Sequence, residues 1–197
     1  MTTPGVDITA DRVREIAPDA LILATGASYR LPNGDFDGAH LVSAWDVIKG
    51  TVQVGNRVVV ADWRCDWIGL GSAEKLASEG CSVRLCVNGE IAGETIQVYV
   101  RYMWAAKLQA LGVATIPYVR MFGADEDTAY FQHIVSNDPV ILEDVDTVVF
   151  ASGHDSETSL QRALVGEDLE MHVIGDSLSP RTAEEAVLEG LKAGFIV

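Results

Sequence analysis

The stretch from Arg57 to Gly89 (RVVVADWRCDWIGLGSAEKLASEGCSVRLCVNG) carries the residues best placed to bind a charged ligand. Arg64 and Asp66 lie between an apolar run and a helical pattern, and Gly69 follows inside that pattern. A guanidinium group can contact phosphate directly, and the free amides at a helix N-terminus attract anions. This arrangement indicates a loop that faces the pyrophosphate of a dinucleotide.

The elements around this loop follow the order strand, turn, helix, strand. Val58 to Ala61 is an unbroken apolar run, which predicts a parallel strand buried on both faces. From Gly69 to Glu79 the apolar residues recur at helical spacing, and Gly80 occupies the expected position of a left-handed cap. Ser82 to Val87 then alternates as a second strand. Together these elements form half of a Rossmann-type nucleotide-binding unit.

The loop departs from the glycine-rich fingerprint of such units. With Gly69 as the third glycine, the first two glycine positions are taken by Arg64 and Asp66. An unpaired aspartate would repel phosphate, whereas Arg64 would compensate by contacting it. Two interpretations therefore remain open: an adenine-nucleotide site that relies on Arg64, or a unit that has kept the architecture and lost the ligand.

Length and composition exclude several classes of function. The 197 residues suffice for one large domain or two small ones, and 48% hydrophobic content with 18 glycines suits an α/β protein. A net charge of −15 argues against nucleic acid and anionic membranes as partners. No apolar run reaches membrane-spanning length. The 3 cysteines and 4 histidines lack metal-ligand spacing, so we expect no metal site and a reduced, cytoplasmic compartment.

Other segments show clear helix and strand patterns. Before the central unit we expect a strand near Val6–Ile8, a helical turn over 10–17, a strand over 19–26 and a helix over 43–48. After it we expect a helix over 95–111, a strand over 113–116, an antiparallel meander (118–122, 128–135 and 140–142) and a final helix over 183–193. Thr182 and Glu185 form the capping box of that last helix.

Two similar strand-to-turn segments flank the central unit. Asp19 to Gly26 and Asp146 to Gly153 both run from an aspartate through a buried strand to a hydroxyl residue and a glycine. We interpret them as the places where the chain crosses between two related domains, one formed by residues 1–50 and 154–197 and the other by residues 51–153. Asp176 ends a later strand and either accepts a sugar-like hydroxyl or simply closes the turn.

This order of motifs resembles that of the two-dinucleotide-binding flavoproteins built like disulfide reductases. Within that group, VVVADWRCDWIGLGSAEKLA is most similar to the C-terminal half of the trimethylamine dehydrogenase and 2,4-dienoyl-CoA reductase family of NADH:flavin oxidoreductases. The resemblance spans almost the whole chain. It implies an α/β fold with a Rossmann-like parallel sheet, an antiparallel β-meander and a partial second nucleotide-binding domain.

The resemblance also assigns candidate binding residues, though no catalytic ones. Positions matching the flavin-side motifs, which take FAD or ADP, are Thr25, Gly26, Gly175 and Asp176. Positions matching the second nucleotide site, which takes NAD(P)H or ADP, are Arg64, Gly69, Gly153 and Asn88, with Asp66 in the same loop. Asn88 is neither the acid that favours NAD nor part of an arginine cluster that favours NADP.

Family members begin with a flavin-bearing barrel and an iron–sulfur cluster, for which this chain is too short and lacks clustered cysteines. We therefore expect a C-terminal piece of a larger flavin-dependent enzyme, inactive alone and purified without stoichiometric FAD. Its partner would be the missing N-terminal part or another subunit. Apolar residues near Leu21–Leu23 and Val173–Ile174 would be left uncovered, so we also expect self-association.

Three functions remain at this point. The first is the nucleotide-binding portion of an amine dehydrogenase, demethylase or enoyl reductase. The second is a non-catalytic structural or interaction module with a degenerate ADP site. The third, an independent NAD(P)H oxidoreductase, is disfavoured because the phosphate loop is incomplete and no thiol pair is visible. Cys81 and Cys86 should face opposite sides of one strand.

Overall fold

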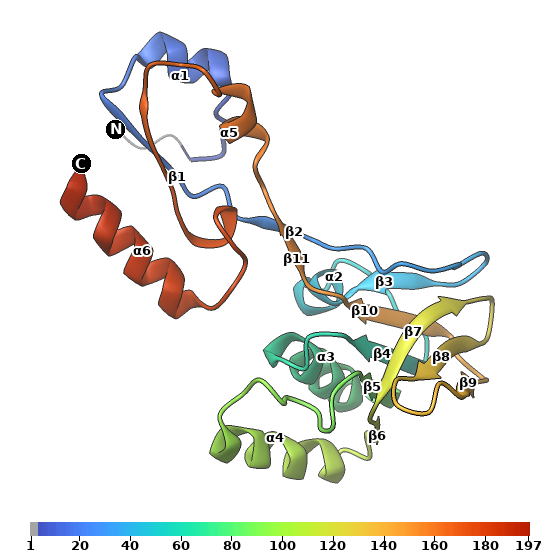
Figure 1. Cartoon of the computed structure of the whole chain (residues 1–197). Helices are drawn as coiled ribbons and strands as arrows, with labels where there is room; N and C mark the ends of the chain where they lie inside the picture. Colours follow the sequence, from blue (N-terminus) through green and yellow to red (C-terminus); the bar gives the residue numbers. More distant parts are fainter. Residues whose placement is uncertain (1–3) are drawn as a thin grey trace. The chain divides into compact units, whose positions relative to one another are not determined.

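The computed structural model describes residues 4 to 197, which divide into two compact units (Figure 1). Unit 2 comprises Tyr29–Gly153, and unit 1 comprises the preceding residues together with His154–Val197. We expected the first crossing near residue 50. Residues 29 to 50 instead belong to unit 2, because β3 (Leu41–Ser43) pairs in its sheet. The nucleotide types assigned to the two units stay predictions.

Unit 2 is built on a parallel sheet of five strands. Their order across the sheet is β3, β10 (Thr147–Ala151), β4 (Arg57–Asp62), β5 (Ser82–Val87) and β6 (Ala114–Ile116). The chain runs outward from β4 through β5 to β6, whereas β10 and β3 lie on the other side of β4. The strand order therefore reverses between β4 and β10, the place where open α/β sheets usually bind their ligands.

Helices cover one face of this sheet. They are α2 (Ala44–Lys49), α3 (Trp67–Ser78) and α4 (Val98–Ala110). Val58 and Val60 of β4 share a core with Leu70 and Leu76 of α3. The predicted helix start at Gly69 is wrong, because Asp66 caps the helix earlier by accepting the Ile68 N–H at 2.9 Å. At α2, which was predicted over 43–48, Ser43 caps the helix by accepting the Asp46 N–H at 3.0 Å.

The antiparallel meander that the sequence predicts is present, and it covers the opposite face of the sheet. It consists of β7 (Val119–Ala124), β8 (Ala129–His133) and β9 (Pro139–Leu142). Val59 of β4 packs in a second core with Phe131 of the meander, so β4 is indeed buried on both faces. Cys86 belongs to this second core and Cys81 to the first, which confirms that the two thiols face opposite sides.

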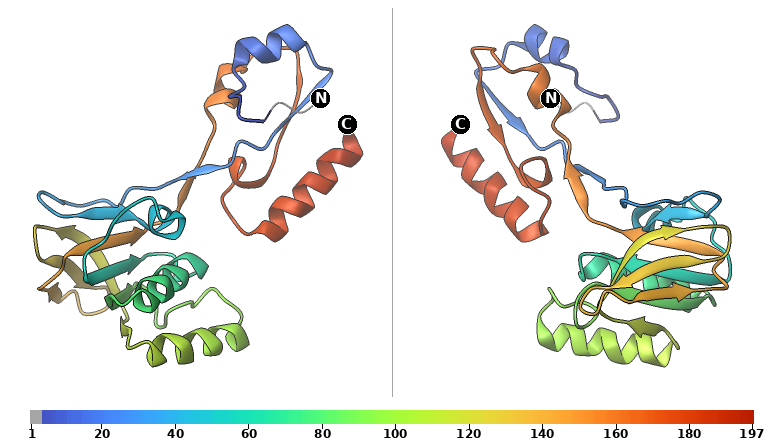
Figure 2. Two further views of the ribbon diagram at one scale, coloured as in Figure 1. Left: turned by 180° about the vertical axis from the view of Figure 1, so that it is seen from behind. Right: turned by 45° about the vertical axis from the view of Figure 1, so that its right-hand side comes forward.

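Unit 1 contains a parallel pair of strands, β1 (Ala20–Leu23) and β12 (Glu170–Val173). Its helices are α1 (Ala10–Ile16), α5 (Ser159–Ala163) and α6 (Ala183–Ile196), and a 3-10 turn, Gly175–Ser177, precedes α6 (Figure 2). The short strands β2 (Ala27–Tyr29) and β11 (His154–Ser156) pair with each other. The strand predicted near Val6–Ile8 is wrong, since these residues have no regular structure.

Helix α6 confirms its predicted start and exposes an apolar side. The capping box of Thr182 and Glu185 is present. Val187, Leu191 and Phe195 are exposed by 71%, 58% and 82%. No helix of the described residues is long and apolar enough to cross a membrane.

Candidate functional site

The carboxyl ends of β4, β5 and β10 bring together the predicted residues of the second nucleotide site. Asn88 follows β5, and its side-chain oxygen lies 3.1 Å from the Cys65 sulfur. Gly153 follows β10 with φ +100°, and an added Cβ would meet the Arg64 side chain at 3.2 Å. A side chain at Gly153 would therefore be strained in its backbone and would crowd Arg64. The structure thus gathers these residues at one edge of the sheet.

Arg64 and Asp66 close the turn between β4 and α3. The Arg64 Nε lies 2.9 Å from Asp66 Oδ2, and Asp66 Oδ1 caps α3. The arginine therefore balances the charge of the aspartate, which agrees with both interpretations of the sequence. Whether Arg64 also contacts a phosphate stays a prediction.

A residue that sequence reasoning missed, Asp62, lies at the centre of this loop. Its Oδ1 accepts the backbone N–H groups of Arg64 and Cys65 at 3.0 and 2.9 Å. Its Oδ2 is buried and has no hydrogen-bond partner among the residues that the structure describes. Burial, and secondarily the charge of Asp66, raises the pKa of Asp62 to about 7.

Gly69 makes room for this buried carboxyl group. A Cβ on Gly69 would lie 2.1 Å from Asp62 Oδ2. Gly69, which takes the position of the third fingerprint glycine, therefore packs against a carboxyl group. The combination of an aspartate ending a buried strand and a glycine in the following helix is the sequence signal that would have identified Asp62.

The loop fits a pyrophosphate poorly. Two of its amides already bind Asp62, and the Ile68 amide binds Asp66. A phosphate approaching these donors would also meet two carboxyl groups. Nor does the loop offer a reactive thiol, since burial raises the pKa of Cys65 to about 11.

In unit 1 the predicted residues Thr25 and Gly26 form the turn after β1. The Thr25 hydroxyl donates to the Glu157 carbonyl at 2.6 Å, and the Gly26 carbonyl accepts the Glu157 N–H at 2.9 Å. Gly26 has φ +79°, which favours glycine. These bonds fix the turn within unit 1.

The predicted residues Gly175 and Asp176 follow β12, which pairs in parallel with β1. The Gly175 N–H donates to Glu189 Oε2 at 2.7 Å, and Asp176 Oδ1 accepts the Arg181 N–H at 3.3 Å. The bond from the Gly175 amide is the main cause that lowers the pKa of Glu189. Glu189, which sequence reasoning also missed, thus occupies an amide near the predicted flavin-side residues. That Asp176 accepts a ligand hydroxyl stays a prediction.

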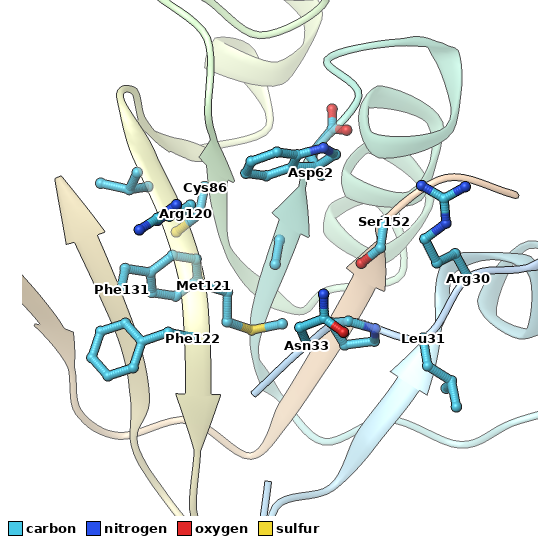
Figure 3. Close-up of a pocket in the computed structure, with 14 residues that line it drawn as sticks. Arg30, Leu31, Asn33, Asp62, Cys86, Arg120, Met121, Phe122, Phe131 and Ser152 are labelled. Carbon is cyan, nitrogen blue, oxygen red and sulfur yellow. The ribbon is translucent and has the colours of Figure 1, made fainter. Parts of the chain in front are cut away.

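A pocket of about 460 Å³ opens in unit 2 on the meander side of the sheet (Figure 3). Met121 and Asn33 point into it, whereas the Asp62 carboxylate points away from them. Trp63, Phe131 and Ser152 are also among its lining residues. Its volume is within the range of small-molecule sites. No group of three potential metal-ligating side chains was found in residues 4–197.

No family model matches this chain, but its sequence is similar to parts of longer curated proteins. It is 27% identical over 104 residues to N,N-dimethylglycine/sarcosine dehydrogenase of Chromohalobacter salexigens, covering 47% of this chain and 15% of the relative. It is 22% identical over 219 residues to dimethylamine dehydrogenase of Hyphomicrobium sp. (strain x), covering 93% of this chain and 30% of the relative. The chain thus spans less than a third of the length of either relative.

Solved structures share the fold. Histamine dehydrogenase from Rhizobium sp. 4-9 matches with a TM-score of 0.89 at 18% identity, covering 95% of this chain and 32% of that one. A flavoprotein disulfide reductase from Escherichia coli matches with a TM-score of 0.65 at 14% identity, covering 85% and 42%. These matches confirm the Rossmann-like, disulfide-reductase-type fold. The chain is homologous to a C-terminal part of the trimethylamine dehydrogenase-like oxidoreductases.

Proposed function

We propose that this chain is the C-terminal nucleotide-binding portion of a flavin-dependent amine dehydrogenase, demethylase or enoyl reductase that works in the cytoplasm. The observation that carries the proposal is its similarity over 93% of its length to 30% of dimethylamine dehydrogenase. Substrate chemistry would then belong to a part or subunit outside this chain. The chain itself would bind nucleotide and its partner, and would have no turnover alone.

The two units would take different nucleotides. FAD or ADP would bind unit 1 at the turns of Thr25, Gly26, Gly175 and Asp176, which lie after two parallel neighbouring strands. NAD(P)H or ADP would bind unit 2 at its carboxyl edge, with Arg64 as the phosphate contact. Both sites would be weak in the isolated chain, because Asp62, Asp66 and Glu189 already bind amides there.

A second function is favoured by the same bonds. If its own carboxylates replace the ligand's phosphates, the chain would be a structural or interaction module with a degenerate ADP site. We expected the uncovered apolar surface near Leu21–Leu23 and Val173–Ile174, but Leu23 is buried. The exposed apolar residues Val187, Leu191 and Phe195 of α6 would instead contact a second copy or the N-terminal part.

Mass spectrometry of small molecules released on denaturation, with visible absorption and sedimentation of the native protein, tests these functions. We expect no stoichiometric FAD, weak ADP binding and self-association. One flavin per chain would contradict our expectation for the isolated protein. Tight partner binding without affinity for ADP, FAD or NAD(P)H would favour the module. A clean monomer that binds no apolar dye would count against the interface on α6.

A further inference from the structure

The turn between β4 and α3 has the geometry of an anion-binding nest. The amides of Arg64 and Cys65, which are consecutive in the chain, both donate to one oxygen, Asp62 Oδ1, at 3.0 and 2.9 Å. Cys65 has φ +52°, a left-handed conformation that few residues other than glycine adopt. Successive amides that converge in such a turn form a concavity for an anion.

The occupant of this nest is held deep in the protein. Asp62 is 2% exposed, and its second oxygen lies beside the first turns of α3, where Gly69 leaves room for it. That oxygen is buried and unpartnered in the described chain, so its position is not explained by a hydrogen bond of its own. Burial of a carboxyl group without full compensation is costly. The bonds from the two amides offset part of that cost.

We propose that Asp62 is the residue that closes this loop to phosphate, by filling with its own carboxylate the nest that a nucleotide's phosphate would occupy. A ligand of the carboxyl edge would then reach Arg64 but not the loop amides. Three features of the loop agree with this. The glycines that admit a phosphate to the backbone are absent, a carboxylate takes two amides, and Asp66 takes the amide of Ile68. The inference deepens the proposed function, since it concerns the same loop.

Three variants separate occupancy of the nest from simple repulsion. Asp62→Ala empties the nest and removes the charge. Asp62→Asn removes the charge while an amide oxygen of the same shape still fills the nest. Asp66→Asn removes the neighbouring charge and keeps a good helix cap, because asparagine caps as well as aspartate does. Urea unfolding and circular dichroism of each variant establish that it is folded.

The test is calorimetric titration of the full chain with inorganic pyrophosphate, with NMR of the Cys65 amide as the local readout. We expect Asp62→Ala to bind pyrophosphate roughly tenfold or more tightly than wild type, the equivalent of one charge-assisted hydrogen bond. The Cys65 amide should shift on titration in that variant alone. Asp62→Asn and Asp66→Asn should gain less. If Asp62→Ala does not fold, the wild-type titration still decides: a shift of its Cys65 amide would overturn the inference.

Other results would also overturn it. Equal gains in Asp62→Ala and Asp62→Asn would show that charge, not occupancy, excludes phosphate. No gain in a folded Asp62→Ala would show that the nest does not bind anions. Neither result bears on the proposed function, which is read separately from ADP and FAD titrations. An ADP complex of the wild type that leaves the Cys65 amide unshifted would support both the inference on Asp62 and the proposed function.

Discussion

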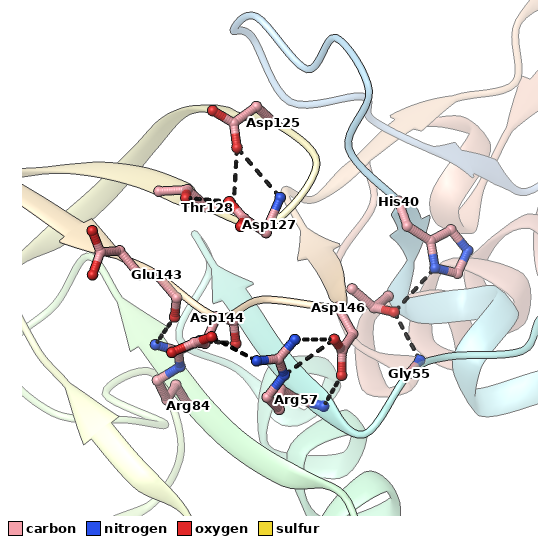
Figure 4. A network of polar contacts seen from close by, with 11 residues as sticks. His40, Gly55, Arg57, Arg84, Asp125, Asp127, Thr128, Glu143, Asp144 and Asp146 are labelled. Carbon is pink, nitrogen blue, oxygen red and sulfur yellow. Dashed lines mark hydrogen bonds and ion pairs between the residues drawn. The ribbon is translucent and has the colours of Figure 1, made fainter.

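The two edges of the parallel sheet in unit 2 each hold a buried or half-buried aspartate, with opposite results. At the amino edge, Asp146 precedes β10 and faces Arg57 at the start of β4 (Figure 4). Asp146 Oδ2 accepts the Arg57 backbone N–H at 2.8 Å, and its Oδ1 accepts Nε and Nη2 at 3.1 and 2.6 Å. These bonds lower the pKa of Asp146 to about 2.

At the carboxyl edge, Asp62 ends β4 without such a partner. Two amides donate to its Oδ1, but its Oδ2 is buried and has no hydrogen-bond partner among the described residues. This burial, together with the charge of Asp66, raises the pKa of Asp62 to about 7. The same residue type therefore stabilises one edge and strains the other, depending on whether the nearby guanidinium group bonds to it, as Arg57 bonds to Asp146, or pairs with another carboxylate, as Arg64 pairs with Asp66. Functional sites are enriched in groups with strongly raised pKa values, and Asp62 lies at the reversal point of the strand order. We interpret the amino edge as structural and the carboxyl edge as the place of function.

The largest expected effect is on the pH dependence of the free energy of unfolding, when Asp62 is replaced by asparagine, which does not titrate. Its pKa is about 7 in the folded chain, whereas the ordinary value for aspartate is 3.8, so between these pH values the folded chain holds a proton that the unfolded chain has released. The free energy of unfolding must then fall as pH rises through this range, by up to about 4 kcal/mol. In Asp62→Asn residue 62 carries no titratable proton, so the free energy of unfolding should not fall for this reason. Urea unfolding at pH 5 and pH 8 should show wild type losing stability relative to Asp62→Asn.

The control for this prediction is the difference between the two proteins, not either curve alone, because the unpaired amide of Asp62→Asn has its own cost at every pH. That cost is independent of pH and cancels when the pH 5 and pH 8 differences are subtracted. A difference that stays constant with pH would mean that Asp62 is not the strained group at this edge.

The next effect concerns Gly69 and tests how closely this residue packs against Asp62 at the carboxyl edge. Gly69→Ala should destabilise the fold by about 1–3 kcal/mol, because the new Cβ would overlap Asp62 Oδ2. In an Asp62→Ala background part of this cost should disappear, because Oδ2 and Cγ are removed while the Cβ of residue 62, 2.7 Å from the new Cβ, stays. A double-mutant cycle of urea unfolding measures the difference. Gly71→Ala is the matched control, since its Cβ would meet only Ile48 at 3.8 Å. Equal costs in both backgrounds would contradict the contact.

Sequence patterns predicted those parts of the fold that local signals determine. The apolar run of β4 implied burial on both faces, and the capping box of α6 and the meander followed from short-range rules. The strand β3 was not predicted, because three residues carry too little periodicity and only pairing with β10 makes them a strand. The expected boundary at residue 50 therefore left these residues in the other domain, whereas they belong to unit 2.

The candidate site was predictable in its location but not in its chemistry. Arg64, Asn88 and Gly153 follow strands of one parallel sheet, so the sequence placed them at one edge. The role of Asp62 depends on tertiary structure: the distance to Gly69, the burial of Oδ2 and the convergence of two amides. None of these is a local property: the sequence shows an aspartate that ends a strand and a glycine in the helix that follows, which marks Asp62 as a candidate but does not give its role.

A smaller effect is expected at the amino edge. Because the pKa of Asp146 is lowered to about 2, its contribution to stability is present above its ordinary pKa of 3.8 and is lost as pH falls toward 2. Asp146→Asn should therefore lower the urea midpoint at pH 6, and the gap to wild type should narrow in acid. Asp144→Asn is the control: this side chain is 81% exposed and contacts only Nη1 of Arg57 at 2.7 Å, so it should change less. If the difference in urea midpoint between wild type and Asp146→Asn did not narrow in acid, the two edges would not differ as we infer.

The smallest expected effect is on nucleotide affinity at the carboxyl edge. If phosphate binds beside Arg64, within about 6 Å of Asp66, then Asp66→Asn should tighten ADP or NAD(H) binding by roughly 1 kcal/mol, the interaction strength expected near a protein surface. Asparagine keeps the cap on α3, so the change tests charge and not helix stability. Arg64→Ala should weaken binding by a similar or larger amount, because charge-assisted contacts are the stronger kind. Calorimetry on wild type and both variants measures these changes. No affinity in any of the three would leave Arg64 and Asp66 as the ion pair that closes the turn, and the carboxyl edge would then resemble the amino edge in role.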